Sequence, residues 1–201
     1  MAEAFAVARL RLPLRDLMPS VSAKIRDHPE RMSLPSVVRL LTATGRGSLF
    51  YNDLFEICGE QLNELTPSDF ATYIYEGGRH GLRTRHLLDA ALARAVELLP
   101  QMGLGDVMRV WQGFIRFSRD RREFYKAAVS RVRPEIGRLV VPHVLLAMRV
   151  ARDLNLQPEF VDLHAACATE LIMKMDSLSL AESAQCLALC AFSARYRAQA
   201  Q

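Results

Sequence analysis

Residues 65–70 read Leu65-Thr66-Pro67-Ser68-Asp69-Phe70, in which an apolar residue is followed four positions later by a helix-capping residue and then by another apolar one. The same pattern returns at residues 32–37, 102–107, 139–144 and 178–183. Its marker positions are separated by 33, 37, 37 and 39 residues and are Ser36, Asp69, Asp106, His143 and Glu182. Ser and Asp side chains accept hydrogen bonds from the free N–H groups of a first helical turn. We therefore expect a helix to begin at each marker.

A second landmark, a pair of large apolar residues, recurs in step with the first. The pairs are separated by 38, 37 and 36 residues and are Leu49-Phe50, Leu87-Leu88, Phe124-Tyr125 and Phe160-Val161. Apolar residues three and four apart follow each pair, as in a helix with one buried face. The two landmarks predict first helices at 36–44, 69–77, 106–117, 143–153 and 181–193. They predict second helices at 49–63, 86–100, 122–137 and 158–174.

The alternation of helices predicts an all-α fold, a right-handed α-solenoid of four to five helix-turn-helix repeats of about 37 residues, because one helix pair cannot bury its apolar face alone. This solenoid would occupy residues 32–201. Residues 1–31 would form a leading helix that caps it, near 14–27, or an import segment, since residues 4–15 are basic and free of acids. The glycine-rich segment Gly77-Gly78-Arg79-His80-Gly81 is expected to terminate a helix.

The charge balance is 26 basic against 22 acidic residues, a net charge of +4. Only Lys24, Lys126 and Lys174 are lysines, so 23 basic residues are arginines, whose planar fork of donors matches phosphates and carboxylates. A GC-rich genome would explain the same excess. The four cysteines contain no CxxC pair and are expected to be reduced, as in the cytosol, nucleus or mitochondrial matrix. No apolar stretch approaches the ~20 residues that span a bilayer.

The repeat unit resembles a known family. Asp69-Phe70 and Asp106-Val107 open one helix, and arginine-rich turns lead to Glu123-Phe124-Tyr125 and Glu159-Phe160, which open the next. A helical hairpin of this length resembles the heptatricopeptide-type repeats of organellar RNA-binding proteins, including the RAP-domain proteins, over roughly residues 32–196. Too few residues follow Tyr196 for a RAP domain. The resemblance implies a mitochondrial matrix protein that takes part in RNA processing or in a mitochondrial ribosome.

Arginines recur at the expected ends of the first helices. Arg46, Arg79 and Arg116 lie ten residues after a marker, and Arg152 lies nine residues after His143. A row of guanidinium groups there would meet successive phosphates of a single RNA strand. The alternative is that they only stabilise helix C-termini, where a cation is favoured. Further RNA-contact candidates in the same turns are Arg83, Arg85, Arg119 and Arg122, with Phe117 and Tyr125 as stacking surfaces or core residues.

The sequence contains no catalytic Ser/His/Asp set, zinc-ligand spacing, paired-carboxylate motif or nucleotide fingerprint. We therefore expect no enzymatic activity, no cofactor and no metal. The leading hypothesis is an RNA-binding scaffold subunit of a mitochondrial ribosome or RNA-processing complex, with RNA and other subunits as partners. The alternative is a protein-only scaffold or accessory subunit of another organellar assembly such as a respiratory complex. In both, the last helix, around Cys186-Leu187, should pack on another protein, or the native chain should continue beyond Gln201, because no complete helix pair follows it in the given sequence.

Overall fold

The computed structural model describes residues 20, 23–25, 27–28, 33–43, 49–80, 85–117, 122–154 and 158–199. These residues form helices and turns, with no strand among them, which confirms the all-α fold. The first helices of the expected pairs are α3 (Leu34–Ala43), α5 (Pro67–His80), α7 (Leu104–Phe117), α9 (Val141–Asp153) and α11 (Leu180–Gln199). The second helices are α4 (Leu49–Glu60), α6 (Arg85–Leu98), α8 (Arg122–Val132) and α10 (Pro158–Met173).

The N-terminal segment predicted as a leading helix lies outside the described residues, apart from 20, 23–25 and 27–28. Of these, residues 20, 23–25 and 27 are helical, and the Ile25 side chain is buried in the core. The distinction between an N-terminal cap and an import segment therefore stays a prediction.

Each described second helix is followed by a short 3-10 turn and one extended residue. The turns are η2 (Leu62–Glu64), η3 (Leu99–Gln101), η4 (Arg133–Arg138) and η5 (Met175–Ser177). The extended residues have φ between -77° and -68° and ψ between 133° and 142°, and they are Leu65, Met102, Leu139 and Leu178. They follow one another at 37, 37 and 39 residues. The chain thus turns in the same way four times at the period found in the sequence.

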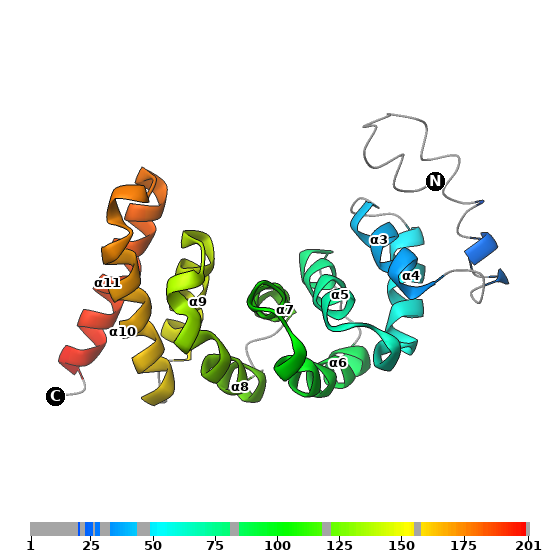
Figure 1. The fold of residues 1–201 in the computed structure, drawn as a ribbon, viewed down its shortest axis with the longest axis horizontal. Coiled ribbons are helices and arrows are strands. Elements are labelled where there is room, and N and C mark those ends of the chain that lie inside the picture. Colours follow the sequence, from blue (N-terminus) through cyan, green and yellow to red (C-terminus); the bar gives the residue numbers. More distant parts are fainter. Residues whose placement is uncertain are drawn as a thin grey trace.

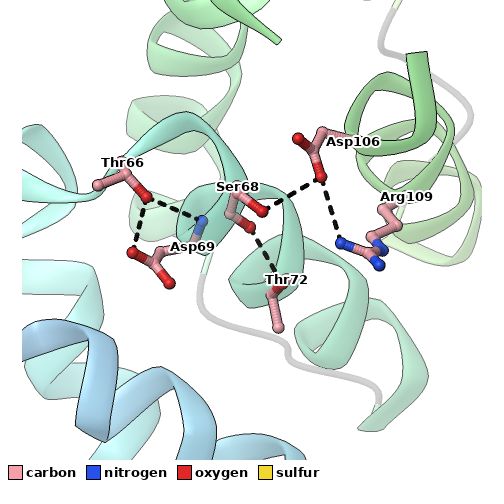
Figure 2. Close-up of polar contacts among 6 residues, drawn as sticks. All are labelled: Thr66, Ser68, Asp69, Thr72, Asp106 and Arg109. Atoms are coloured by element: carbon pink, nitrogen blue, oxygen red, sulfur yellow. Dashed lines mark hydrogen bonds and ion pairs between the residues drawn. The ribbon is translucent and has the colours of Figure 1, made fainter. Parts of the chain in front are cut away.

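Helices α3, α5, α7 and α9 begin two residues before the predicted markers. Their first helical hydrogen bonds, like that of α11, run to backbone carbonyls three residues upstream of the markers, those of Ser33, Thr66, Gly103, Val140 and Ser179. The marker residues therefore sit in the first turn of their helices. At α5 the Thr66 hydroxyl accepts from the Asp69 N–H at 3.2 Å and donates to its carboxylate at 2.6 Å (Figure 2). We refer to these five upstream residues as the cap residues.

Helix α5 runs through Gly77 and Gly78 and ends at His80, which is within the glycine-rich segment as predicted but three residues beyond the expected end at position 77. Gly77 and Gly78 do not end the helix, and Gly78 allows close approach of α7. A Cβ atom on Gly78 would lie 2.5 Å from the carbonyl oxygen of Gly113, and one on Gly113 would lie 2.4 Å from that of Ile74. Both distances are shorter than real Cβ contacts, so only glycine fits where the two helix backbones meet.

The helices form an open arch (Figure 1), with α5, α7 and α9 along its inner side and α6 and α8 along its outer side. Successive first helices contact one another from α3 to α11, and the α5–α7 contact is the most extensive. Helices α5 and α7 are parallel, because Ser68 meets Asp106 near their N-terminal ends and Gly78 meets Gly113 in their C-terminal halves. The core lies between the two rows, where the largest fully buried side chains include Trp111, Tyr73, Phe70, Phe114, Phe124 and Phe160.

Basic side chains attach second helices to the turn of the preceding unit. Arg94 of α6 donates to the carbonyl oxygen of Asn63 at 3.0 Å. Lys174, at the end of α10, donates to the carbonyl oxygens of Leu139 at 2.7 Å and Gly137 at 3.1 Å. These contacts satisfy carbonyls that a helix C-terminus leaves without partners.

Candidate binding surfaces

Two of the predicted RNA-contacting arginines lie on one edge of the arch. Arg79 is in the last turn of α5 and Arg116 is in the last turn of α7, and the two helices are parallel. The Arg79 guanidinium lies 3.6 Å from the buried Glu76 carboxylate. Arg116 is exposed and forms no ion pair within the part of the chain that the structure describes. Arg79 thus already has an anionic partner within the chain.

Arg152 occupies a different position from Arg79 and Arg116. The residue ten positions after His143 is Asp153, so the turn of α9 places an acid where α5 and α7 carry an arginine. Adjacent residues point about 100° apart around a helix. Arg152 is half-buried and pairs with Asp153, with its Nε 2.8 Å and a terminal nitrogen 2.7 Å from the carboxylate.

The remaining candidates cannot be placed in the same way. Arg46, Arg83 and Arg119 lie outside the described residues, and Arg85 and Arg122 begin α6 and α8 with side chains that are not described. The same holds for the Phe117 side chain. Tyr125 is buried and its ring lies 5.7 Å from that of Trp111, so it belongs to the core and offers no surface for stacking a base.

A buried polar cluster that sequence reasoning missed lies where α5 ends against α4. Glu76 is 4% exposed, and its carboxylate lies 3.3 Å from His80 Nε2 as well as 3.6 Å from Arg79. The His80 ring packs against Tyr51 of α4, with ring centroids 4.3 Å apart. The equivalent positions in α7, α9 and α11 are Gly113, Val150 and Leu189. The repeat spacing aligns position 76 with these apolar or small residues, and this was the signal that could have singled out Glu76.

Burial also controls the titration of nearby core groups. It raises the pKa of Cys58 to about 12, helped by the charge of Asp69, and it raises the pKa of Cys167 to about 12. The pKa of Tyr73 is raised for the same reason. These thiols are therefore protonated at neutral pH, and a protonated buried thiol is a poor nucleophile and metal ligand. Among the described residues, no group of three or more His, Cys, Asp or Glu side chains could hold a metal ion.

The outer side of α11 differs from the other first helices. Eight residues after the cap residue, α5 carries Ile74, α7 carries Trp111 and α9 carries Met148, with 1%, 0% and 0% exposure. Ile74 lies against Gly113 of the next first helix, α7. The equivalent residue of α11 is Leu187, and it is 71% exposed.

Leu187 belongs to a longer apolar stripe. Helix positions 1, 5, 8 and 12 after a cap residue lie on one face, and in α11 they are Leu180, Ala184, Leu187 and Ala191, which we refer to as the α11 stripe. All four side chains are exposed, Leu180 by 89%. Exposed apolar side chains continue nearby at the end of α10 and in η5, at Ile172, Met173 and Met175. A contiguous exposed apolar surface of this kind is typical of a protein interface.

Compared with known proteins, the chain matches no family model, no curated protein and no solved structure. The resemblance to heptatricopeptide-type repeats therefore stays a prediction. Within the described ranges, no helix combines the length and apolar character that crossing a bilayer requires.

Proposed function

We propose that this chain is a non-catalytic scaffold of helical repeats that binds a partner protein through the α11 stripe. The observation that carries the proposal is Leu187, which is 71% exposed at a position that three other first helices bury completely or nearly so. Burying one such leucine contributes about 1.5–3 kcal/mol, so the exposed stripe is a substantial source of binding free energy.

The contacts between successive first helices indicate which kind of partner would fit the α11 stripe. At the α5–α7 junction, Ile74 meets a parallel helix at Gly113, where the two helix backbones approach closely. The α11 stripe, with two leucines and two alanines, is similarly apolar and narrow. The proposed occupant is therefore an α-helix of a different protein that lies along α11 and presents small and aliphatic residues. Helices pack in this way when ridges of one enter grooves of the other.

The repeat architecture itself is supported by two independent recurrences. The extended turn residues return at 37, 37 and 39 residues with the same backbone angles. Buried positions also recur at a fixed distance from the cap residues, as the series Ile74, Trp111 and Met148 shows. In a stack of this kind, each unit contacts only its neighbours, and an end unit needs a cap or a partner. The right-handed solenoid and its four to five units belong to this proposal.

Contact with RNA is the second candidate function, and exposed Arg116 favours it. Arg149 of α9 is likewise exposed without an ion pair in the described ranges. Three described arginines of the first helices are already paired with carboxylates, however: Arg79 with Glu76, Arg109 with Asp106 and Arg152 with Asp153. This pairing supports the protein scaffold more than a continuous phosphate-tracking row. A place in a mitochondrial ribosome, an RNA-processing complex or another organellar assembly stays a prediction from the sequence.

Site-specific crosslinking in the native cells tests the proposal. A photoreactive residue at position 187 should yield one protein adduct of defined mass, and the same residue at exposed Lys126 should not. The adduct's crosslinked peptide should be helical and should come from another gene product. Leu187→Asp should remove that partner from the purified complex, whereas Arg116→Gln should retain it.

Other outcomes would replace the proposal. A crosslink from position 187 to the same chain, together with a dimer in sedimentation velocity, would mean that the stripe mediates self-association. If the partner is released by ribonuclease, or by Arg116→Gln but not by Leu187→Asp, then RNA contact is the function. If nothing crosslinks at position 187 in the assembled state, the stripe is not an interface.

A further inference from the structure

A cavity of about 420 Å³ lies between the N-terminal ends of α7 and α9 and the η4 turn. Its polar lining comes from Arg131 at the end of α8, Glu135 and Arg138 of η4, and His143 of α9. The α7 side is lined by the backbone around Gly105. This volume is within the range of sites that hold small organic molecules.

The same junction one unit earlier has different residues. Thirty-seven positions before Gly105, Glu135, Arg138 and His143, the chain carries Ser68, Leu98, Gln101 and Asp106. There the Ser68 hydroxyl donates to Asp106 at 3.4 Å, and Asp106 also accepts from Arg109 at 3.2 Å (Figure 2). Side chains therefore link the α5 and α7 ends directly.

At the α7–α9 junction this link is missing and the space is open. Gly105 has no side chain, and a Cβ atom built there would meet nothing within 4 Å. His143 replaces the acid that occupies the equivalent position 106. Burial and the positive charge of Arg109 lower the pKa of His143, so its imidazole is neutral at pH 7. The substitutions thus remove a carboxylate and a hydroxyl from this junction and leave a cavity.

The charge of the cavity favours an anion. Arg131 and Arg138 both pair with the single Glu135 carboxylate, so the three side chains together carry one positive charge. The N–H groups of Leu104 and Gly105 precede the first backbone hydrogen bond of α7, which runs from Asp106 to Gly103. Such N–H groups at a helix N-terminus have no partner within the helix and attract anions.

We propose that this cavity binds the phosphate group of a small molecule. Guanidinium groups match phosphate oxygens with pairs of parallel hydrogen bonds, and two of them face the cavity. The Gly105 N–H would hold a further oxygen, and the neutral His143 ring would contribute one more hydrogen bond. Glu135 holds the two guanidinium groups in place in the empty cavity and competes with the ligand for them. This function is independent of the α11 stripe, which lies on other elements.

Calorimetric titration of the full chain with inorganic phosphate, in a chloride buffer, tests the proposal with two matched pairs of variants. Arg138→Gln should weaken phosphate binding roughly tenfold, the loss expected for one charge-assisted hydrogen bond. Its control is Arg133→Gln, because Arg133 lies in the same turn but pairs with Asp162, 3.4 Å away, and does not line the cavity. In the opposite direction, Glu135→Gln should strengthen binding, whereas Asp162→Asn, an identical charge change at the Arg133 pair, should not.

A third variant reproduces the earlier junction. Gly105→Ser combined with His143→Asp should abolish phosphate binding and leave the fold intact, as a far-ultraviolet circular dichroism spectrum would verify. Equal effects of Arg138→Gln and Arg133→Gln would mean general attraction to surface charge and would overturn the site. A single-stranded oligonucleotide that binds more tightly than phosphate, in a way that Arg138→Gln weakens, would show that the cavity holds a nucleic-acid phosphate and would overturn the small-molecule ligand.

Discussion

The α5–α7 junction and the outer side of α11 carry the same kind of side chains in the same register, yet one is sealed and the other is open. Ile74 is 1% exposed and Leu187 is 71% exposed, although both lie eight residues after a cap residue. What differs is the neighbour, because α5 is followed in the row by α7 and no described helix follows α11. The exposure of a side chain at this position thus depends on whether another helix covers it, more than on the sequence of its own helix.

The comparison predicts the largest difference between Met148→Ala and Leu187→Ala. Met148 is fully buried between first helices, so its truncation should lower the free energy of unfolding by about 2–5 kcal/mol. Leu187→Ala should change it by less than about 0.5 kcal/mol, as exposed substitutions do. Urea unfolding of the isolated chain, followed by circular dichroism, measures both.

Two results would break this comparison. A large loss for Leu187→Ala at low protein concentration would mean that the stripe is covered within the chain itself. A loss that appears only at high concentration would mean that the stripe is covered by a second copy.

The next largest effect concerns the glycines. Gly113→Ala should destabilise the protein by about 1–3 kcal/mol, because its Cβ would lie 2.4 Å from the backbone oxygen of Ile74, which cannot move aside as a side chain can. Gly105→Ala, in the first turn of the same α7, should be neutral or stabilise by up to about 1 kcal/mol, since nothing lies within 4 Å of its Cβ. Thermal unfolding of the pair measures the difference, and equal effects would show that α5 and α7 do not touch at Gly113.

The helix pairs could be predicted from the sequence because two landmarks recur in step. Most helix bounds agree to within three residues, but α8 ends five residues earlier and α11 ends six residues later than predicted. The starts were misplaced by two residues because Ser36, Asp69 and Asp106 were interpreted as caps. Their carboxylates and hydroxyls lie in the first turn, and the cap is three residues upstream. The end of α5 was placed three residues early, at Gly77, because a glycine pair can end a helix or admit a close neighbour, and only the packing of α7 decides between them.

The binding surfaces were less predictable. Counting along the sequence placed Arg152 with Arg79 and Arg116, but a one-residue shift moves a side chain about 100° around a helix. The same register could have identified Glu76 as a buried charge, because its equivalents are Gly113, Val150 and Leu189. Ion pairs between elements far apart in the sequence, such as that of Arg133 with Asp162, depend on how the helices pack, and spacing along the sequence does not supply this.

A smaller effect compares two hydroxyl groups at the N-terminal end of α5, those of Thr66 and Ser68. Thr66→Ala should destabilise α5 by about 1 kcal/mol, because the hydroxyl satisfies the Asp69 N–H and the carboxylate together. Ser68→Ala should have less effect, since its 3.4 Å bond to Asp106 is long. Urea midpoints of the two variants measure this difference, and an equal loss would mean that the Thr66 cap is not formed in solution.

The smallest effect is the pH dependence of the cap of α11. Ser179 donates its hydroxyl at 2.6 Å and its backbone N–H at 2.8 Å to the Glu182 carboxylate, and these hydrogen bonds hold the pKa of Glu182 below the usual value for a glutamate. A carboxyl whose pKa is lowered by folding stabilises the folded state above its unfolded pKa, and this contribution is lost as the pH falls through the folded pKa. The first turn of α11 should therefore loosen only in acid.

Carbon-detected nuclear magnetic resonance of the Glu182 carboxyl group measures this titration directly. Ser179→Ala should return the midpoint toward that of an unfolded glutamate, and the Ser183 amide, which bonds to the Ser179 carbonyl, should lose protection from hydrogen exchange. Ser177→Ala is the control, because its hydroxyl donates to the Lys174 carbonyl instead. Leu180 follows this cap directly and is 89% exposed, so a loosened first turn would misplace one end of the α11 stripe. Binding of the proposed partner helix should then weaken in acid for the wild-type protein, and it should already be weaker at neutral pH for Ser179→Ala. If neither change alters the affinity for the partner, the interface lies away from this end of α11.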